Sequence, residues 1–428
     1  MSYPEIIQIE PTTRCNLNCR MCIRRIWGIK LQDMDYTLFK KIASESFNRI
    51  NRLVLYGFGE PFVHPRILDM LRLSRDKLSH DSEILIVSNG TLLTQDLADK
   101  VQGKIGVDIL AFSIDSMDLL KLAEIRGSKN PSVIIRNLLY LARKKDSGRR
   151  SLKLGISVVL MRDNFGDIID IIRVAAENEL DFVFVSQVVP YSLSVGRLSA
   201  FTTVSQASFE EYSKLGFIDE EFVRMSIYQT LAGVYFGGGE AKHAKTMQDL
   251  WRRVSDRGYQ LNVPMLHKTR LEYEFFKKIW DTFREARKLA DEYDIELTLP
   301  KVFADALDRS CPYVDKSAVF VRSDGLVVPC MEFAYGHMLF VNGHFKEIRE
   351  VVFGDVRRDS LGNIWNSEEY SSFRVIREDI SRRIPWCGDC PYVTRECWFV
   401  RNNDYDCYGN RYSCSECLYS AGLSRCLI

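Results

Sequence analysis

Three cysteines near the start of the chain have the residue type and spacing for metal chemistry. Cys15, Cys19 and Cys22 follow a short apolar run at residues 6–9. Three thiolates on one tight loop can hold three irons of a four-iron, four-sulfur cluster, which usually has four cysteine ligands. The missing fourth ligand predicts one iron that is open to another molecule. A zinc site or three unrelated buried cysteines are the alternatives, although zinc more often has paired C-x-x-C arms separated by a longer loop.

A second candidate site lies one predicted strand further along the chain. Gly57, Gly59 and Glu60 directly follow the apolar run at 52–56. Glycine lets the backbone approach a ligand closely, and a buried carboxylate can pair with an ammonium group. Short polar residues also end the next two predicted strands, although an ordinary turn is the alternative there.

The three-then-two spacing of the cysteines resembles the signature of radical S-adenosylmethionine enzymes. In that family the open iron binds the amino acid end of S-adenosylmethionine, which is cleaved reductively to a 5′-deoxyadenosyl radical. The resemblance implies that Glu60 binds the amino group, and that polar strand ends hold the ribose, carboxylate and adenine. The implied cofactor-binding residues are Gly57, Gly59, Glu60, Asn89, Ser113, Asp115, Arg126 and Gln187. Met21 stands where the family often has an aromatic residue, and its thioether can pack against adenine.

The elements that must position these residues alternate between strands and helices. Strands are predicted at residues 6–10, 52–56, 83–87, 109–114, 152–160 and 182–187. Between them lie stretches with apolar residues three or four apart, which is typical of amphipathic helices. This alternation implies a parallel sheet with right-handed crossovers. Six such units resemble the partial (β/α)6 barrel of the radical S-adenosylmethionine family, in which chemistry occurs at the carboxyl ends of the strands.

The fold class predicted from these patterns is α/β, with three regions. Residues 1–202 are the barrel core, and residues 203–300 are a helical elaboration with a long helix at 271–293 and a closing strand at 295–299. Residues 301–428 are a cysteine-rich domain of a β-hairpin, loops and short helices.

The C-terminal region holds nine of the twelve cysteines. Predicted strands at 318–321 and 326–328, joined by an Asp-Gly turn, bring Cys311 and Cys330 together. With Gly325 between them, these cysteines resemble the SPASM extension, which implies two auxiliary four-iron clusters in addition to the radical cluster. The candidate ligands are Cys311, Cys330, Cys387, Cys390, Cys397, Cys407, Cys414, Cys417 and Cys426. Two clusters need eight ligands, so either one cysteine is spare or one cluster has unusual ligands; a zinc ribbon is the alternative.

The cysteine-rich tail resembles a subgroup associated with tungsten-containing aldehyde oxidoreductases. The predicted function is therefore that of a maturase acting on such an oxidoreductase or its pterin cofactor. The second hypothesis is a modifier of peptides or proteins, by peptide crosslinking or sulfatase-maturase-like oxidation. The third is an electron carrier without catalysis. The sequence indicates no single catalytic residue.

Composition limits the partners and the compartment. The 58 basic and 57 acidic side chains give no electrostatic case for nucleic acid or a membrane surface. No apolar run approaches the roughly 20 residues that span a bilayer, and no signal peptide pattern begins the chain. We therefore expect a cytoplasmic protein whose cysteines bind metal rather than form disulfides. Its expected partners are a protein, peptide or cofactor substrate and a low-potential electron donor such as ferredoxin or flavodoxin.

Overall fold

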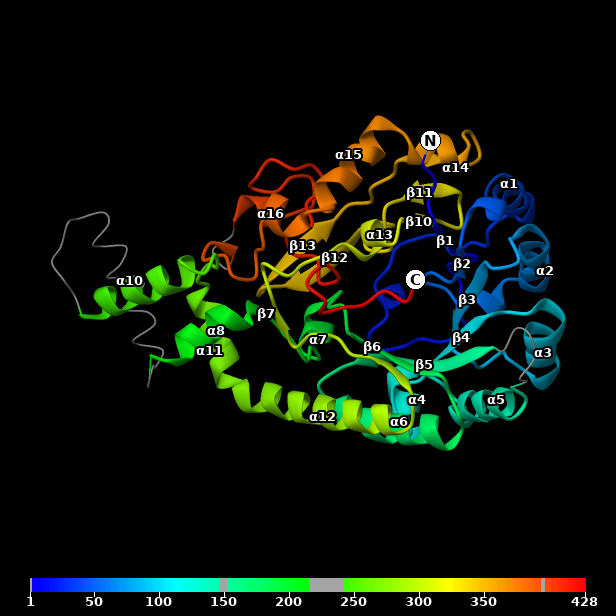
Figure 1. Ribbon diagram of the computed structural model, residues 1–428, viewed down its shortest axis with the longest axis horizontal. Helices are drawn as coiled ribbons and strands as arrows, with labels where there is room; N and C mark the ends of the chain where they lie inside the picture. Colours follow the sequence, from blue (N-terminus) through cyan, green and yellow to red (C-terminus); the bar gives the residue numbers. More distant parts are fainter. Residues whose placement is uncertain (1, 146–151, 216–241, 394–396) are drawn as a thin grey trace.

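The computed structural model describes residues 2–145, 152–215, 242–393 and 397–428. One sheet of ten strands runs through these residues (Figure 1). Its strands, in spatial order, are β14 (Gly354–Asp355), β11 (Leu326–Val328), β10 (Ala318–Val321), β1 (Ile6–Ile9), β2 (Arg52–Leu55), β3 (Glu83–Ser88), β4 (Ile109–Ser113), β5 (Lys153–Leu160), β6 (Phe182–Gln187) and β8 (Glu296–Thr298). Strands β1 to β6 are parallel and follow one another in the chain. The predicted partial barrel with a C-terminal SPASM-like domain is confirmed.

The sheet is curved around an apolar interior. Ile6, Val54, Leu85 and Phe184 come from four different strands and belong to one buried cluster, together with Phe320 of β10. The residues that alternate with these in the same strands point to the other face and pack against the outer helices in the main core. Because alternate side chains of a strand point to opposite faces, the two clusters define the inside and the outside of the barrel.

Helices cover the outer face of the sheet, as the apolar spacing predicts. These are α1 (Tyr36–Ser46), α2 (Ile67–Lys77), α3 (Gln95–Asp99), α4 (Leu119–Arg126), α5 (Ser132–Arg143), α6 (Ile168–Glu177) and α12 (Tyr273–Glu292). The predicted helix at 271–293 begins at Tyr273, because Glu272 leaves helical geometry and separates α12 from α11 (Val263–Leu271). Helix α4, which follows β4 and ends at Gly127, was not predicted.

A small second sheet joins the start of the predicted middle region to the residues just after its end. Strand β7 (Thr202–Ser205) pairs in parallel with β9 (Phe303–Ala304). Helices α8 (Gln206–Ser213) and α11 contact β7, α10 (Lys242–Ser255) packs on α8, and α7 (Leu193–Gly196) contacts β12 (His337–Val341). No helix in the described ranges is both long and apolar enough to cross a bilayer.

The C-terminal region completes the barrel. Strand β10 pairs in parallel with β1, Ile6 opposite Ala318 and Ile9 opposite Val321. The last residues then run along the interior. There the Leu423 carbonyl accepts from the backbone N–H of Gln187 at 3.4 Å, and the Leu427 carbonyl accepts from the Tyr56 hydroxyl at 3.0 Å. Figure 1 shows the C-terminus inside the arc of β1 to β6. The hairpin and the tail therefore close the side that the parallel strands leave open.

The remaining C-terminal helices and strands precede the seven last cysteines of the chain. They are α13 (Pro312–Asp315), β12 (His337–Val341), β13 (His344–Ile348), α14 (Leu361–Trp365), α15 (Glu368–Arg377) and α16 (Ile380–Arg383).

Candidate functional site

The N-terminal cysteine loop is held between two glycine positions. A Cβ on Gly59 would lie 2.1 Å from the Thr12 carbonyl oxygen, and one on Gly127 would lie 2.5 Å from the Asn18 carbonyl oxygen. The Glu60 amide donates to the Arg14 carbonyl at 2.8 Å. Only glycine allows such close approach on both sides, so these contacts fix the backbone of the loop between the end of β2 and the end of α4.

The three thiols of this loop lie close enough to affect one another. Burial, together with the charges of Cys19 and Cys15, raises the pKa of Cys22 to about 11. Burial also raises the pKa of Cys19, while the guanidinium of Arg126 beside it lowers that pKa. The crowded thiols disfavour one another's ionisation, and a buried cation lies next to one of them. Such a site suits a cationic metal group, because the metal stabilises thiolates.

Arg126 is itself held by a buried carboxylate. Its Nε lies 2.6 Å from Asp115 Oδ2, and Asp115 Oδ1 also accepts from the Val159 amide at 2.8 Å. Asp115 is fully buried and Arg126 is 7% exposed. Both residues were predicted to contact the cofactor; in the structure Asp115 positions Arg126, and Arg126 faces Cys19.

Glu60 and the residues after β3 form one hydrogen-bonded unit. The Glu60 carboxylate accepts from Ser88 Oγ at 2.8 Å and from the Asn89 amide at 2.7 Å. Asn89 Nδ2 donates to Asn16 Oδ1 at 2.9 Å and lies 3.7 Å from Cys15 Sγ. The structure therefore brings Glu60 and Asn89 to the cysteine loop. Glu60 Oε1 also accepts from the Phe62 amide at 3.2 Å. Each carboxylate oxygen has two acceptor positions, so Oε2, which among the described residues accepts only from Asn89, can still bind an ammonium group.

The structure places two other predicted residues, Ser113 and Gln187, on opposite faces of the barrel sheet. Ser113 ends β4 on the inner face of the barrel and is half-buried. Gln187 lies on the outward face of β6, in line with Val183 and Val185. Its side-chain Nε2 donates to the Ala200 carbonyl at 3.2 Å. The structure does not bring Gln187 to the cysteine loop.

Binding at Glu60 is expected to depend on pH. Burial raises the pKa of Glu60 from 4.5 to about 7, so the carboxyl group is mostly neutral below that pH in the free protein. An ammonium ligand needs the ionised form, and its affinity should therefore rise as the pH increases from about 5.5 to about 7, with close to one proton released per ligand at the acid end. Calorimetry with S-adenosylmethionine in buffers of different ionisation enthalpy measures this proton release.

Glu60→Gln is the control for that measurement, because an amide cannot titrate. The variant should bind S-adenosylmethionine more weakly and with the same affinity across this range. A pH dependence that persists in the variant would assign it to another group.

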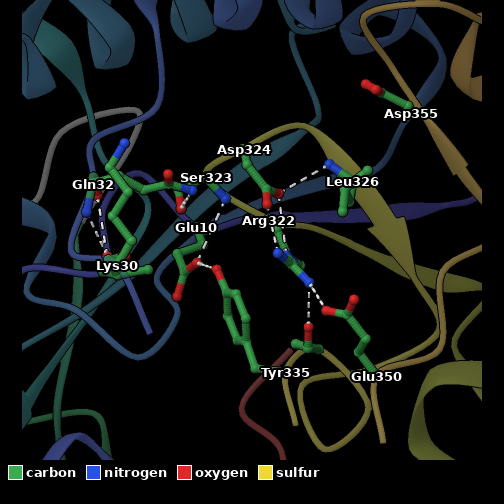
Figure 2. A network of polar contacts seen from close by, with 12 residues as sticks. Glu10, Lys30, Gln32, Arg322, Ser323, Asp324, Leu326, Tyr335, Glu350 and Asp355 are labelled. Carbon is green, nitrogen blue, oxygen red and sulfur yellow. Dashed lines mark hydrogen bonds and ion pairs between the residues drawn. The ribbon is translucent and has the colours of Figure 1, made fainter. Parts of the chain in front are cut away.

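A buried polar network connects this site to the C-terminal hairpin (Figure 2). Glu10 follows β1 and accepts from the Phe58 amide at 3.0 Å, from the Tyr335 hydroxyl and from the Ser323 amide. Arg322 stacks 4.1 Å above the Tyr335 ring and pairs with Asp324 and Glu350. Glu10 is not among the residues predicted from the sequence. A carboxylate directly after an apolar strand, in line with the inward-facing Gln8, is the signal that could have identified it.

Four C-terminal cysteines line one cavity with largely apolar walls. Cys311, Cys330, Cys414 and Cys417 surround it together with Phe333, Leu339 and Phe373. Burial raises the pKa of Cys330, and the charges of Cys311, Cys417 and Cys414 raise it further. We call these four residues the inner cysteine group. The hairpin brings Cys311 and Cys330 together, as predicted.

Four other cysteines gather nearer the surface. Cys387, Cys390 and Cys397 pack together, and the charges of Cys390 and Cys397 act on Cys407. Cys407 is exposed, whereas Cys387 and Cys414 are buried. We call Cys387, Cys390, Cys397 and Cys407 the outer cysteine group. In the described ranges, no three Cys, His, Asp or Glu side chains converge as ligands of a single metal ion do.

Cys426 is the ninth C-terminal cysteine and lies in the tail inside the barrel. Burial raises its pKa, and Cys311 adds to that effect, but the residue does not line the inner cavity. Its charge acts on Tyr56 and Tyr313. Cys426 therefore belongs to neither group of four.

A carboxylate beside the inner cysteine group is paired with an imidazole, since Glu332 lines the inner cavity and lies next to His337. His337 Nε2 is 3.4 Å from Glu332 Oε1, both side chains are at most 10% exposed, and His337 Nδ1 contacts the Tyr335 carbonyl at 2.9 Å. Glu332 Oε2 has no hydrogen-bond partner among the residues that the structure describes. Tyr191 packs against His337, with ring centroids 5.2 Å apart, and the charges of Glu332 and Cys22 both act on it. None of these three residues has a sequence signal that distinguishes it.

Comparisons with known proteins identify the same two regions. The model of the Radical SAM superfamily matches residues 9–178, and that of SPASM, an iron–sulfur cluster-binding domain, matches residues 311–391. A tungsten-containing aldehyde ferredoxin oxidoreductase cofactor-modifying protein of Pyrococcus furiosus is 26% identical over 428 residues, which are 99% of this chain and 97% of that protein. An AdoMet-dependent heme synthase of Methanosarcina barkeri is 23% identical over 427 residues, 98% and 97% of the two chains. The structure of Streptococcus suis SuiB bound to precursor peptide SuiA shares the fold with a TM-score of 0.51 and 15% identity, covering 92% of this chain and 71% of that one.

Proposed function

Because the chain belongs to the radical S-adenosylmethionine superfamily and carries a SPASM domain, we propose that it matures a tungsten-containing aldehyde oxidoreductase, by modifying that enzyme or its pterin cofactor. The observation that carries this proposal is the end-to-end match to the cofactor-modifying protein of Pyrococcus furiosus, at 26% identity. This match includes the cysteine-rich tail, where the sequence pattern already resembles that subgroup.

The proposed radical site consists of residues at the carboxyl ends of the strands. Cys15, Cys19 and Cys22 would hold the four-iron cluster, and Glu60 and Asn89 would bind S-adenosylmethionine. When bound, these groups supply reductive cleavage of a carbon–sulfur bond and abstraction of a hydrogen atom. The chain orients them through the Gly59 and Gly127 contacts, and the apolar interior excludes water and competing hydrogen donors.

The proposed auxiliary clusters use eight of the nine C-terminal cysteines. We assign one cluster to the inner cysteine group and the other to the outer cysteine group, so Cys426 is the spare residue. The shared cavity of the inner group and the packing of the outer group support this division.

The substrate would lie in the barrel interior between the radical site and the inner cysteine group. Glu332 is directed by His337 and keeps one oxygen without a partner, so it is suited to accept a hydrogen bond from a substrate N–H group. Tyr191 and Tyr419 carry aromatic surface beside it, since the charge of Glu332 acts on both. These features fit a planar, nitrogen-rich ring such as a pterin.

The test of this function is reconstitution under anaerobic and reducing conditions. The enzyme, an electron donor such as ferredoxin or flavodoxin, and S-adenosylmethionine are incubated with a tungsten oxidoreductase produced without its maturase. We expect 5′-deoxyadenosine to form in proportion to a mass change on the oxidoreductase or its released pterin. The Cys19→Ala variant is the control for background chemistry.

A peptide modifier is the second candidate, because the SuiB structure that shares this fold holds a precursor peptide. This alternative predicts that 5′-deoxyadenosine forms in proportion to a mass change on a leader-containing peptide, and that the oxidoreductase gives no such product. That result would replace the maturase proposal while retaining the radical chemistry.

A further inference from the structure

Two buried arginines in the C-terminal region lack an acidic partner. Arg377 is 1% exposed and Arg309 is 6% exposed. Within the described ranges, no carboxylate lies within ion-pair distance of either guanidinium, whereas the neighbouring Arg382 and Arg411 pair with acidic side chains. Burying an unpaired charge costs several kcal/mol per ion, so each of these cations needs an anion that the protein chain alone does not supply.

These arginines donate to backbone carbonyls, those of Ile380 and Ile384 in the case of Arg309, and both lie near thiols. Arg377 Nε donates to Cys414 Sγ at 3.2 Å, and its other nitrogens donate to the Phe373 carbonyl at 2.9 Å and to the Tyr412 carbonyl. The charges that act on Arg309 come first from Cys417, Cys414 and Cys387. Two guanidinium groups therefore flank the inner cysteine group, one from α15 and one from the segment before Cys311.

Several cations near the other cysteines are paired with carboxylates. At the radical site, Arg126 is paired with Asp115 at 2.6 Å. Lys346 and His344 both pair with Glu416, at 3.2 and 2.9 Å. Lys346 and Glu416 act on Cys387 and also line the inner cavity, as does Glu332. Arg24, which acts on Cys15 and Cys22, is only half-buried. Arg377 and Arg309 differ from these cations because they are buried and no carboxylate of the described residues lies at ion-pair distance from them.

Charge and hydrogen bonding at the sulfurs set the potential of an iron–sulfur cluster. Reduction adds a negative charge, which a buried guanidinium stabilises more strongly at low dielectric than a neutral ion pair does. The hydrogen bond to Cys414 acts in the same direction, because it strengthens as electron density on the sulfur rises.

We propose that Arg377, assisted by Arg309, raises the reduction potential of the auxiliary cluster held by the inner cysteine group. This inference rests on the proposed assignment of that cluster to Cys311, Cys330, Cys414 and Cys417. Arg377 is a positioning residue, and its role is to make this cluster readily reduced inside the protein, next to the substrate space.

The experiment is a redox titration followed by electron paramagnetic resonance. It uses the full chain with Cys15, Cys19 and Cys22 replaced by alanine, so that the signals come from the auxiliary clusters. In this background, Arg377→Gln should lower the potential of one cluster and leave the other unchanged. We expect the ratio of reduced to oxidised inner cluster at a fixed applied potential to fall about tenfold, which is about 59 mV for a one-electron couple.

Two further variants separate this effect from damage to the fold. Arg374→Gln removes a guanidinium from the same helix that stacks on Trp365 at 3.7 Å and has no contact with sulfur, so it should leave both potentials unchanged. Arg377→Lys keeps the charge but loses the planar fork, and should give a smaller shift in the same direction.

An Arg377→Gln variant that keeps its iron and sulfide and both parental potentials would overturn the inference. If that variant instead loses the inner cluster, Arg309→Gln decides, because it acts through charge without a hydrogen bond to a thiol. A loaded Arg309→Gln protein with an unchanged inner potential would equally overturn the inference. A parent that binds only one auxiliary cluster would instead refute the ligand assignment under Proposed function.

Discussion

Cys19→Ala is expected to lower the rate of reductive S-adenosylmethionine cleavage at least about a thousandfold, which corresponds to about 4 kcal/mol in activation free energy. The thiol is one of only three on the loop, and it is the one that Arg126 faces. Its removal leaves two ligands for the proposed cluster. It also leaves the buried Arg126–Asp115 pair without the anion beside it. We therefore expect the variant to lose the cluster, rather than to keep the cluster and cleave S-adenosylmethionine more slowly.

The measurement is 5′-deoxyadenosine formation with dithionite as reductant, together with iron analysis of the anaerobic protein. Met21→Leu is the matched control, because Met21 lies in the same loop, is 7% exposed and packs with Ile125 and Met161. This change keeps the apolar volume and should keep both cluster and cleavage within a fewfold range. Cleavage by Cys19→Ala at the parental rate would remove this loop from the proposed site.

The sequence predicted the barrel well because the six parallel strands are short apolar runs flanked by polar turns. Predicted and observed bounds of β6 coincide at residues 182–187, and those of β2 differ by a single residue. Buried parallel strands are apolar on both faces, so this signal is strong. The cysteine loop and Glu60 could be predicted for a similar reason, since each directly follows such a strand.

The sequence could not show which distant segments meet. Strand β10 pairs with β1 across more than three hundred residues of chain, and a local pattern carries no information about that partner. The hairpin was therefore predicted as part of a separate domain, whereas it extends the barrel sheet. The division of nine cysteines into two groups also depends on long-range folding, because Cys311 and Cys330 share a cavity with Cys414 and Cys417.

Side-chain direction explains the other differences. Gln187 was expected to reach the cofactor, but it has the parity of Val183 and Val185, which face the outer core. Alternation along β6 could have predicted this orientation. Asp115 and Arg126 were both taken as cofactor contacts, and their mutual ion pair depends on how the end of α4 returns to the end of β4.

Cys417→Ala is expected to remove one complete auxiliary cluster, whereas Cys426→Ala should remove none. Cys417 lines the inner cavity with three other thiols, and Cys426 lies outside it. We therefore expect Cys417→Ala to lose about four irons per chain, since each cluster holds four. Without its anion, the inner group would also leave Arg377 and Arg309 buried and unpaired, which should destabilise the C-terminal region by about 3–5 kcal/mol.

Iron and sulfide analysis of the reconstituted proteins, with thermal unfolding under anaerobic conditions, measures both effects. Cys426→Ala is the matched control, because both residues are C-terminal cysteines whose pKa is raised by burial and differ in their place relative to the cavity. The decisive comparison is between the two variants rather than with the parent alone. If Cys426→Ala lost about four irons and Cys417→Ala kept them, the tail cysteine would be the ligand, and the inner group would have to be redefined around Cys311 and Cys426.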